Sequence, residues 1–188
     1  MAETRKFAAI LAADIAGYSK LAGADEERTL ARLRGLRSDL IDPAIAAHHG
    51  RVVKRTGDGV LIEFRSVVDA VRCAIEVQNG MVERNAGLPS ERRIEFRIGV
   101  HVGDVVEESD GDLMGDGVNI GARLEGIAKP GSICLLEDAY RQVRDRLNHQ
   151  QRPKQRRRKG GSLRQTGKSG SCLTTPQCSL KAAGVIDG

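Results

Sequence analysis

The stretch VVKRTGDGVLIEF, residues 52–64, is the strongest indication of the fold because it places two strand-forming runs on either side of a Gly-Asp-Gly turn. Val, Ile and Phe favour strands, and Asp-Gly is one of the strongest local signals for a β-hairpin. The sequence therefore predicts strands at 52–55 and 60–64 joined by a turn at 56–59. An Asn-Gly turn would make the same hairpin, so the charged residues Lys54, Arg55 and Asp58 need a further explanation.

The elements predicted before and after this hairpin complete one α+β domain. Residues 7–13 form an apolar run too short for a helix, which predicts a buried strand. Leucines at three-to-four spacing within residues 23–45 predict a helix that ends or bends near Pro43. Ser66 has the place of a capping residue at the start of a second helix that extends to about residue 82.

The second half of the domain continues the alternation of strands and helices. Residues 93–108 predict a long strand, residues 115–131 a helix stopped by Pro130 and Gly131, and residues 133–136 a further strand. The order is β-α-β-β-α-β followed by α-β. This order predicts a ferredoxin-like core, in which an antiparallel sheet carries helices on one face.

The composition favours a globular protein of the cytoplasm. Of the 188 residues, 40% are hydrophobic, 29% are charged and only 3% are aromatic, which predicts an aliphatic core. No apolar run reaches the ~18 residues of a transmembrane segment, and the run at residues 6–14 is too short for a signal peptide. Four cysteines without CxxC spacing disfavour a zinc site or disulfide framework and fit a reducing compartment.

The positive charge lies in the C-terminal segment. Residues 148–188 contain nine Lys or Arg and one acid, which leaves 21 basic and 24 acidic residues in residues 1–147. The net charge of +5 therefore gives no reason to expect a specific nucleic-acid partner for the folded part. We predict a domain at 1–147 and a disordered basic tail at 148–188, capable at most of weak contact with polyanions.

Two aspartates predict a metal site at one edge of the sheet. Asp14 ends the first predicted strand and Asp58 lies in the hairpin turn. Pairing of that strand with the hairpin would bring both carboxylates to one edge, where they repel and need a cation. Mg²⁺ accepts one or two protein carboxylates and completes its coordination with water and phosphate oxygens. Each aspartate alone is more simply a turn or surface residue, and only the pair favours a metal site.

Four motifs resemble the successive motifs of class III nucleotide cyclases, in order and at compatible intervals over residues 5–147. They are FAAILAADIAGYSKL (7–21), GRVVKRTGDGVLIEF (50–64), FRIGVHVGDVV (96–106) and GDLMGDGVNIGARLEGIA (111–128). The resemblance implies the class III cyclase homology domain and an adenylate cyclase of intracellular signalling. Such an enzyme converts ATP to 3′,5′-cyclic AMP and pyrophosphate at a homodimer interface with two Mg²⁺ or Mn²⁺ ions per site.

The resemblance also implies roles for seven residues. They are the metal ligands Asp14, Ile15 (through its main-chain carbonyl) and Asp58; the base-reading residues Lys54 and Asp112; Asn119, which positions the ribose; and Arg123, which stabilises the transition state. In the family the metal ligands come from one partner of the dimer and the other residues from its mate. The hairpin would then serve two sites, with Asp58 facing the metals of one and Lys54 the base in the other.

The chemistry of the bases agrees with these roles. Adenine presents an acceptor at N1 to a lysine and a donor at N6 to a carboxylate, whereas guanine presents the reverse pattern. Each mismatched buried group costs ~1–3 kcal/mol, so Lys54 and Asp112 favour ATP over GTP. Asn119 and Arg123 are four residues apart and share one face of the predicted helix.

The segment 148–188 departs from the family, which continues with further strands and a lysine that contacts the triphosphate. Available lysines are Lys154, Lys159, Lys168 and Lys181, and no motif singles one out. We hypothesise that a reading-frame change replaced the last strands. The alternative function is then a catalytically weak or inactive nucleotide-binding or dimerisation module. Lys54 and Asp112 disfavour a guanylate cyclase, and the lack of a GGDEF-like signature disfavours a diguanylate cyclase.

Overall fold

The computed structural model describes residues 4–148 and 180–183. The strands are β1 (Thr4–Ile15), β2 (Arg51–Arg55), β3 (Val60–Phe64), β4 (Phe96–Glu107), β5 (Leu113–Met114), β6 (Ile133–Leu136) and β7 (Leu180–Ala183). The α-helices are α1 (Tyr18–Ala24), α2 (Glu26–Leu36), α3 (Asp42–Ala47), α4 (Val67–Asn85), α5 (Asp116–Ile127) and α6 (Glu137–Asn148). A π-helical turn, η1 (Arg37–Ile41), joins α2 to α3, and a 3-10 turn, η2 (Ser90–Arg92), precedes β4.

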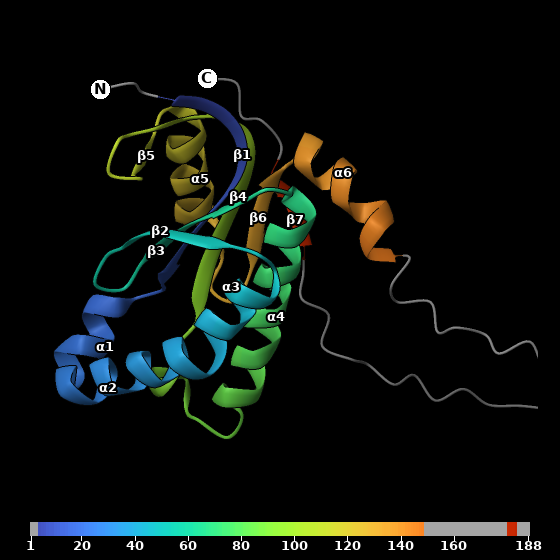
Figure 1. Ribbon diagram of the computed structural model, residues 1–188. Coiled ribbons are helices and arrows are strands. Elements are labelled where there is room, and N and C mark those ends of the chain that lie inside the picture. Colours follow the sequence, from blue (N-terminus) through green and yellow to red (C-terminus); the bar gives the residue numbers. More distant parts are fainter. Residues whose placement is uncertain (1–3, 149–179, 184–188) are drawn as a thin grey trace, which may run out of the picture.

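The described strands form one sheet in the order β2-β3-β1-β4-β6-β7, and β5 pairs with β4 (Figure 1). At its centre β1 and β4 pair antiparallel over their full length, from Thr4 opposite Glu107 to Ile15 opposite Phe96. The predicted hairpin forms as β2 and β3 and joins the sheet through β1. Because α5 carries the chain back along the sheet, β6 runs parallel to β4.

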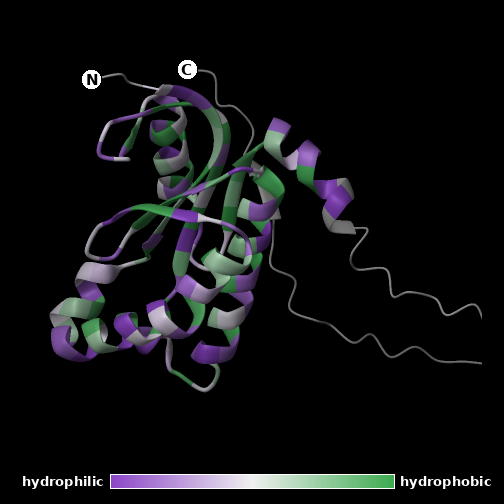
Figure 2. Ribbon diagram, viewed as in Figure 1, coloured by the Kyte–Doolittle hydropathy of each residue, from purple (hydrophilic) through white to green (hydrophobic). Residues whose placement is uncertain are grey.

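Different helices cover the two faces of the sheet. Along β1, Ala9 and Leu11 belong to the main core, to which α2, α3, α4 and α6 also contribute buried residues. The alternate residues Ala8 and Ile10 face the opposite side, where they pack with residues of α5 and β5. Figure 1 shows α4 and α5 on opposite sides of β1 and β4, and Figure 2 shows that α4 and α6 carry both hydrophobic and hydrophilic residues.

Helix α5 lies unusually close to the sheet because glycines line the contact. A side-chain carbon added at Gly99 of β4 would collide with the main chain of α5 at Gly121 and Glu125. One added at Gly117 would lie 2.8 Å from the main-chain oxygen of Asp104. The absence of side chains at these positions therefore brings α5, with its polar residues, directly against β4.

The predicted helix at residues 23–45 divides at a π-helical turn. Asp25 caps α2 by accepting a hydrogen bond from the main-chain nitrogen of Arg28 at 3.0 Å. The turn η1 ends at Ile41, and Pro43 then occupies the first turn of α3, where a proline is tolerated. The helix therefore does not end at Pro43, and a short π-helical segment, of the kind often found near functional sites, lies just before the proline.

The sequence-based prediction of an α+β domain with a largely antiparallel sheet is confirmed. Most helices cover one face, as expected, and the structure adds α5 on the other face and a parallel pairing of β6. It also adds β7, which pairs parallel to β6 within the segment where no strand was expected. The boundary at residue 147 and the disorder of the tail stay predictions, since residues 149–179 and 184–188 lie outside the described part.

Two further observations concern the predicted location. None of the helices in the described ranges is long and apolar enough to cross a membrane. Cys73 and Cys134 are buried free thiols, and burial raises the pKa of Cys73 to about 12. Cys172 and Cys178 lie outside the described residues, as do Lys154, Lys159 and Lys168.

Candidate active site

The structure brings Asp14 next to the hairpin turn that carries Asp58. The antiparallel register of β1 and β3 places Ala13 opposite Val60, so Asp14, which follows Ala13, lies beside Gly59, which precedes Val60. A side-chain carbon at Gly59 would lie 3.9 Å from the Cβ of Asp14 and 3.3 Å from the main-chain oxygen of Ala13. Ile15 follows directly and ends β1 with its side chain buried. The three predicted metal ligands therefore gather at one end of β1.

Two residues that the sequence analysis did not identify complete this region. Arg97, opposite Asp14 on β4, donates from Nε to Asp14 Oδ1 at 2.9 Å and makes a second, shorter bond from Nη2 to Oδ2. Arg97 Nη2 also lies 3.5 Å from Glu125 Oε1 of α5. We call Asp14, Asp58, Arg97 and Glu125 the carboxylate cluster.

The electrostatics of the carboxylate cluster show an excess of negative charge. Burial, a hydrogen bond to Asp14 and the charges of Asp14 and Asp58 raise the pKa of Glu125 to about 7, although Arg97 opposes the shift. Three carboxyl groups thus share one guanidinium. Such a region favours the arrival of a further cation.

The oxygen atoms at this end of β1 suit divalent cations, but Arg97 already binds one of the carboxylates. Two carboxylates and a neighbouring main-chain carbonyl are oxygen ligands of the kind that Mg²⁺ takes from proteins. Within residues 4–148 and 180–183, no three His, Cys, Asp or Glu side chains are arranged as a ready metal cluster. Asp14 is also bound by Arg97, so a cation that binds there must compete with the guanidinium.

The hairpin turn is held from outside by the π-helical turn. Arg37 of η1 donates from Nη2 to the main-chain oxygen of Gly57 at 2.9 Å and to that of Thr56 at 3.4 Å. Within the turn, Gly59 N donates to Thr56 Oγ1 at 3.1 Å. These bonds fix the segment that presents Asp58.

The predicted base-reading residues form a direct pair. Lys54 Nζ lies 3.2 Å from Asp112 Oδ2, and the other carboxylate oxygen accepts from the main-chain nitrogen of Leu113 at 2.9 Å. The hydrogen bond from Lys54 and the one from Leu113 lower the pKa of Asp112. The side chain of Lys54 is 60% exposed and that of Asp112 30% exposed, so both are accessible to a ligand.

A β-bulge in β2 aims Lys54 at this position. Arg51 pairs with Glu63 and Val52 with Ile62, whereas Lys54 pairs with Leu61, so Val53 is an extra residue. In a regular strand residues 51 and 54 would point to opposite faces, but the bulge places Arg51 and Lys54 on the same face. That face is the one covered in part by α5.

The remaining predicted site residues lie on α5. Asn119 and Arg123 are both exposed and four residues apart on this helix. Neither side chain makes a hydrogen bond or ion pair with another residue in the described ranges. No hydrogen bond or ion pair in those ranges joins the Lys54–Asp112 pair to the carboxylate cluster either. One copy thus carries two separate sets of polar side chains.

Arg97 and Glu125 left only a weak signal in the sequence. Arg97 interrupts the apolar strand FRIGV, and a charge in a buried strand indicates a partner on a neighbouring element. That partner follows only from the register of β1 and β4, which pairs Arg97 with Asp14. Glu125 reaches the carboxylate cluster only because α5 packs against β4.

Comparison with known proteins places the chain in a family. Residues 1–169 match the family model of the adenylate and guanylate cyclase catalytic domain. The chain is 46% identical over 144 residues to "Putative adenylate cyclase 3" of Rhizobium meliloti (strain 1021), a match that covers 77% of this chain and 24% of that protein. It is 33% identical over 128 residues to an adenylate cyclase of Streptomyces coelicolor, covering 68% of this chain and 32% of that protein. The chain therefore spans about a quarter to a third of these relatives.

Solved structures agree with this assignment. The crystal structure of an adenylate/guanylate cyclase/hydrolase from Silicibacter pomeroyi is 46% identical, with a TM-score of 0.72 over 77% of this chain and 84% of that one. The adenylyl cyclase CyaB from P. aeruginosa shares the fold at 22% identity, with a TM-score of 0.67 over 77% and 84% of the two chains. By its sequence motifs, its sheet and these relatives, the chain belongs to the adenylate and guanylate cyclase catalytic-domain family, the class III nucleotide cyclases.

Proposed function

We propose that two copies of this chain form an adenylate cyclase that converts ATP to 3′,5′-cyclic AMP and pyrophosphate. The observation that carries the proposal is the pair formed by Lys54 and Asp112, whose charged atoms lie 3.2 Å apart on an accessible surface. The donor of Lys54 suits N1 of adenine and the acceptor of Asp112 suits its N6 amine. Guanine would set a donor against the lysine and an acceptor against the carboxylate, which disfavours GTP.

The separation of the two sets of side chains supports the proposed homodimer. The carboxylate cluster lies at one end of β1, and the described residues show no hydrogen bond or ion pair between it and Lys54, Asp112, Asn119 or Arg123. A second copy related by two-fold symmetry would bring the carboxylates of one copy opposite the second set of the other, and would do so twice. The exposed positions of Asn119 and Arg123 support this arrangement, because neither is engaged within its own copy.

The proposed reaction is attack of the ribose 3′-oxygen on the α-phosphorus of ATP. The new O–P bond forms as the bond to the β-phosphate oxygen breaks, the 3′-hydroxyl loses its proton and pyrophosphate leaves. Asn119 would orient the ribose, and Arg123 would offset the charge that develops on the α-phosphoryl oxygens. A preorganised donor of this kind contributes about 10²–10³-fold in rate.

Asp14, Asp58 and the main-chain carbonyl of Ile15 would hold two Mg²⁺ or Mn²⁺ ions. Bound there, the cations lower the pKa of the 3′-hydroxyl and neutralise the triphosphate. Arg97 would then keep the Asp14 carboxylate in position from one side, as it does in the structure. Glu125 would hold Arg97 from α5.

The direct test is incubation of the purified chain with ATP and Mn²⁺ or Mg²⁺ while cyclic AMP is measured, with GTP as the competing substrate. We expect cyclic AMP as the main product. The yield of cyclic GMP from GTP under the same conditions should be lower by a factor of about ten or more. Asp58→Ala should abolish turnover while the far-UV circular dichroism spectrum stays unchanged. Unchanged turnover in this variant would remove the metal assignment.

One observation favours the alternative of a nucleotide-binding module without turnover. Both oxygens of Asp14 are engaged by Arg97, which could keep a cation out. Calorimetric titration with ATP in the presence of Ca²⁺, followed by the cyclase assay with Mn²⁺, separates the two functions. Binding without product would establish the module, and product would establish the enzyme.

A further inference from the structure

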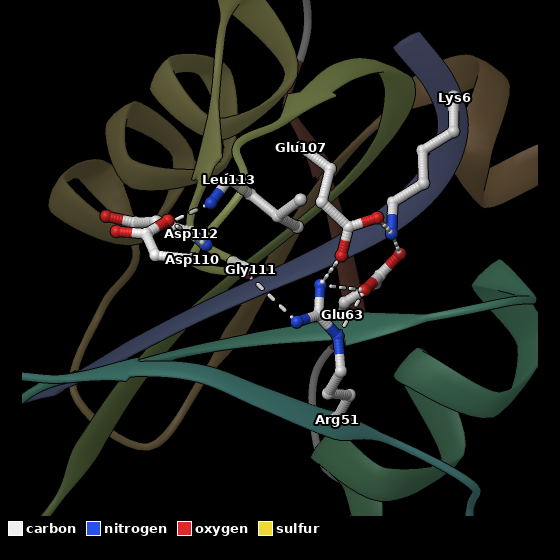
Figure 3. Close-up of polar contacts among 8 residues, drawn as sticks. All are labelled: Lys6, Arg51, Glu63, Glu107, Asp110, Gly111, Asp112 and Leu113. Atoms are coloured by element: carbon white, nitrogen blue, oxygen red, sulfur yellow. Dashed lines mark hydrogen bonds and ion pairs between the residues drawn. The ribbon is translucent and has the colours of Figure 1, made fainter. Parts of the chain in front are cut away.

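A closed ring of four charged side chains lies beside the turn that carries Asp112 (Figure 3). We call Lys6 of β1, Arg51 of β2, Glu63 of β3 and Glu107 of β4 the charge ring. Lys6 Nζ lies 2.6 Å from Glu63 Oε1 and 2.7 Å from Glu107 Oε2. Arg51 Nη2 lies 2.6 Å from Glu63 Oε2 and 2.9 Å from Glu107 Oε1. Each carboxylate thus bridges both cations with its two oxygens.

The ion pairs of the charge ring stabilise this part of the sheet because their side chains are partly shielded from water. The side chain of Glu63 is only 14% exposed. Burial alone would raise the pKa of Glu63, but hydrogen bonds from Lys6 and Arg51 outweigh it and lower this pKa. Charged hydrogen bonds of this kind are shorter and stronger than neutral ones. The ring therefore ties four neighbouring strands together at one place.

One donor of Arg51 extends from the charge ring to the turn between β4 and β5. Nη1 of Arg51 donates to the main-chain oxygen of Gly111 at 3.0 Å. Gly111 has a φ of +85°, and the next residue is Asp112. Within the turn, Asp112 N donates to Asp110 Oδ1 at 3.0 Å. Arg51 is thus the only described side chain outside this turn that hydrogen-bonds to its main chain.

This contact matters most when a base is bound. In the free protein, Lys54 and Asp112 hold each other at 3.2 Å. A base that takes both groups as partners must separate them, and the position of Asp112 then depends on what else holds its turn. Among the described residues, the bond from Arg51 to Gly111 is then the remaining side-chain hydrogen bond between this turn and the strand that carries Lys54.

We propose that Arg51 is a specificity-determining positioning residue, which sets the preference for adenine by fixing the turn that carries Asp112. The inference rests on the proposed function only in taking Lys54 and Asp112 as the groups that meet the base. A carboxylate held at one place accepts from the amine of adenine and meets the carbonyl of guanine with repulsion. A carboxylate free to move would withdraw from guanine, and discrimination would fall.

The planar guanidinium is needed for this role. Arg51 donates from Nε and Nη2 to the carboxylates of the charge ring and from Nη1 to the turn. The rigid guanidinium fixes the directions of these three hydrogen bonds. The ammonium of a lysine is a single point of charge and cannot reach both carboxylates and the turn at once. Arg51→Lys is therefore expected to keep part of the ring and lose the turn contact.

The test compares Arg51→Met with Lys6→Met as the matched control. Both variants remove one cation and two ion pairs from the charge ring, but only Arg51→Met removes the bond to Gly111. In Arg51→Met we expect the ratio of kcat/KM for ATP to that for GTP to fall about tenfold, with KM for ATP raised and kcat within about threefold of wild type. In Lys6→Met we expect a lower Tm and a ratio within about twofold of wild type.

A second readout needs no catalysis. Hydrogen–deuterium exchange of residues 108–114 in the nucleotide-free protein should be about tenfold faster in Arg51→Met than in Lys6→Met. If wild type turns over neither nucleotide, the proposed function fails, and exchange together with the relative affinity for ATP and GTP still decides the role of Arg51.

Three outcomes decide the proposal. A selectivity loss together with faster exchange in Arg51→Met alone supports it. Equal loss in both variants shows that the ring acts only through general stability, and unchanged selectivity in Arg51→Met overturns the inference. Should Arg51→Met fail to fold, Arg51→Lys takes its place. If the ratio of kcat/KM for ATP to that for GTP in Arg51→Lys equals that of wild type, the inference is overturned.

Discussion

At the scale of single residues, Glu63 shows how a strand accommodates a shielded charge. Its pKa is lowered because Lys6 and Arg51 outweigh the effect of burial. The unfolded chain therefore binds the proton more readily than the folded one. The stabilisation from Glu63 is fully present above the ordinary glutamate pKa of 4.5 and is lost as the pH falls through the lower folded value.

We accordingly expect Glu63→Gln to lower the free energy of unfolding by about 2 kcal/mol near neutral pH. The difference from wild type should shrink as the solution is made more acidic than the glutamate range. Urea denaturation at a series of pH values measures it. The exposed pair of Glu137 and Arg141 supplies the control, since Glu137→Gln should change stability by less than about 0.5 kcal/mol throughout. A penalty for Glu63→Gln that does not vary with pH would contradict the account.

At the scale of elements, the packing of α5 depends on Gly99. An added carbon there would collide with the main chain of α5, which cannot move aside as a flexible side chain would. We expect Gly99→Ala to lower the free energy of unfolding by about 1–3 kcal/mol. Chemical denaturation measures this. In Gly35→Ala, where no atom lies within 4 Å of the added carbon, we expect a gain of up to about 1 kcal/mol.

The contact between the π-helical turn and the hairpin turn leads to a second prediction. Arg37 holds the main-chain oxygens of Thr56 and Gly57, next to Asp58. Arg37→Met should loosen the hairpin turn and weaken Mn²⁺ binding several-fold, about the loss of one hydrogen bond. Calorimetric titration with Mn²⁺ measures the affinity. Arg34→Met is the control, since Arg34 is exposed on the adjoining helix and makes no described hydrogen bond or ion pair with the turn. Equal affinity in both variants would refute the role of Arg37.

At the scale of the whole molecule, the proposed homodimer can be tested with mixed copies. Asp58→Asn and Arg123→Ala should each be inactive alone. In an equal mixture about half of the dimers contain one copy of each, and each such dimer has one complete site, so about a quarter of wild-type activity should return. The cyclase assay on refolded or co-expressed mixtures measures the recovery.

The matched control for this mixture combines two defects of the same half-site. Asp14→Asn with Asp58→Asn leaves every mixed dimer with a damaged metal half in both sites, so no activity should return. Recovery in this control would show that Asp14 and Asp58 of different copies serve one site, and no recovery in the first mixture would contradict a site shared between copies.

The local elements follow from the sequence, which also predicted most residues of the candidate site. The hairpin at residues 52–64, the strand at 133–136 and the helix carrying Asn119 and Arg123 follow from propensity and periodicity, which act over a few residues. The closeness of Asp14 to the hairpin turn followed from the expected strand pairing. The pairing of Lys54 with Asp112 was foreseeable only through the family motifs.

Which side chains share a face and which charges meet depends on the tertiary fold. The bulge at Val53 turns Arg51 and Lys54 to one side, and no local pattern announces it. Arg97 meets Asp14 through a strand register that joins residues 83 positions apart. Glu125 reaches them because glycines let α5 settle on the face opposite α4. These contacts arise from the packing of distant elements, which depends on the shape of the whole core rather than on the preferences of neighbouring residues.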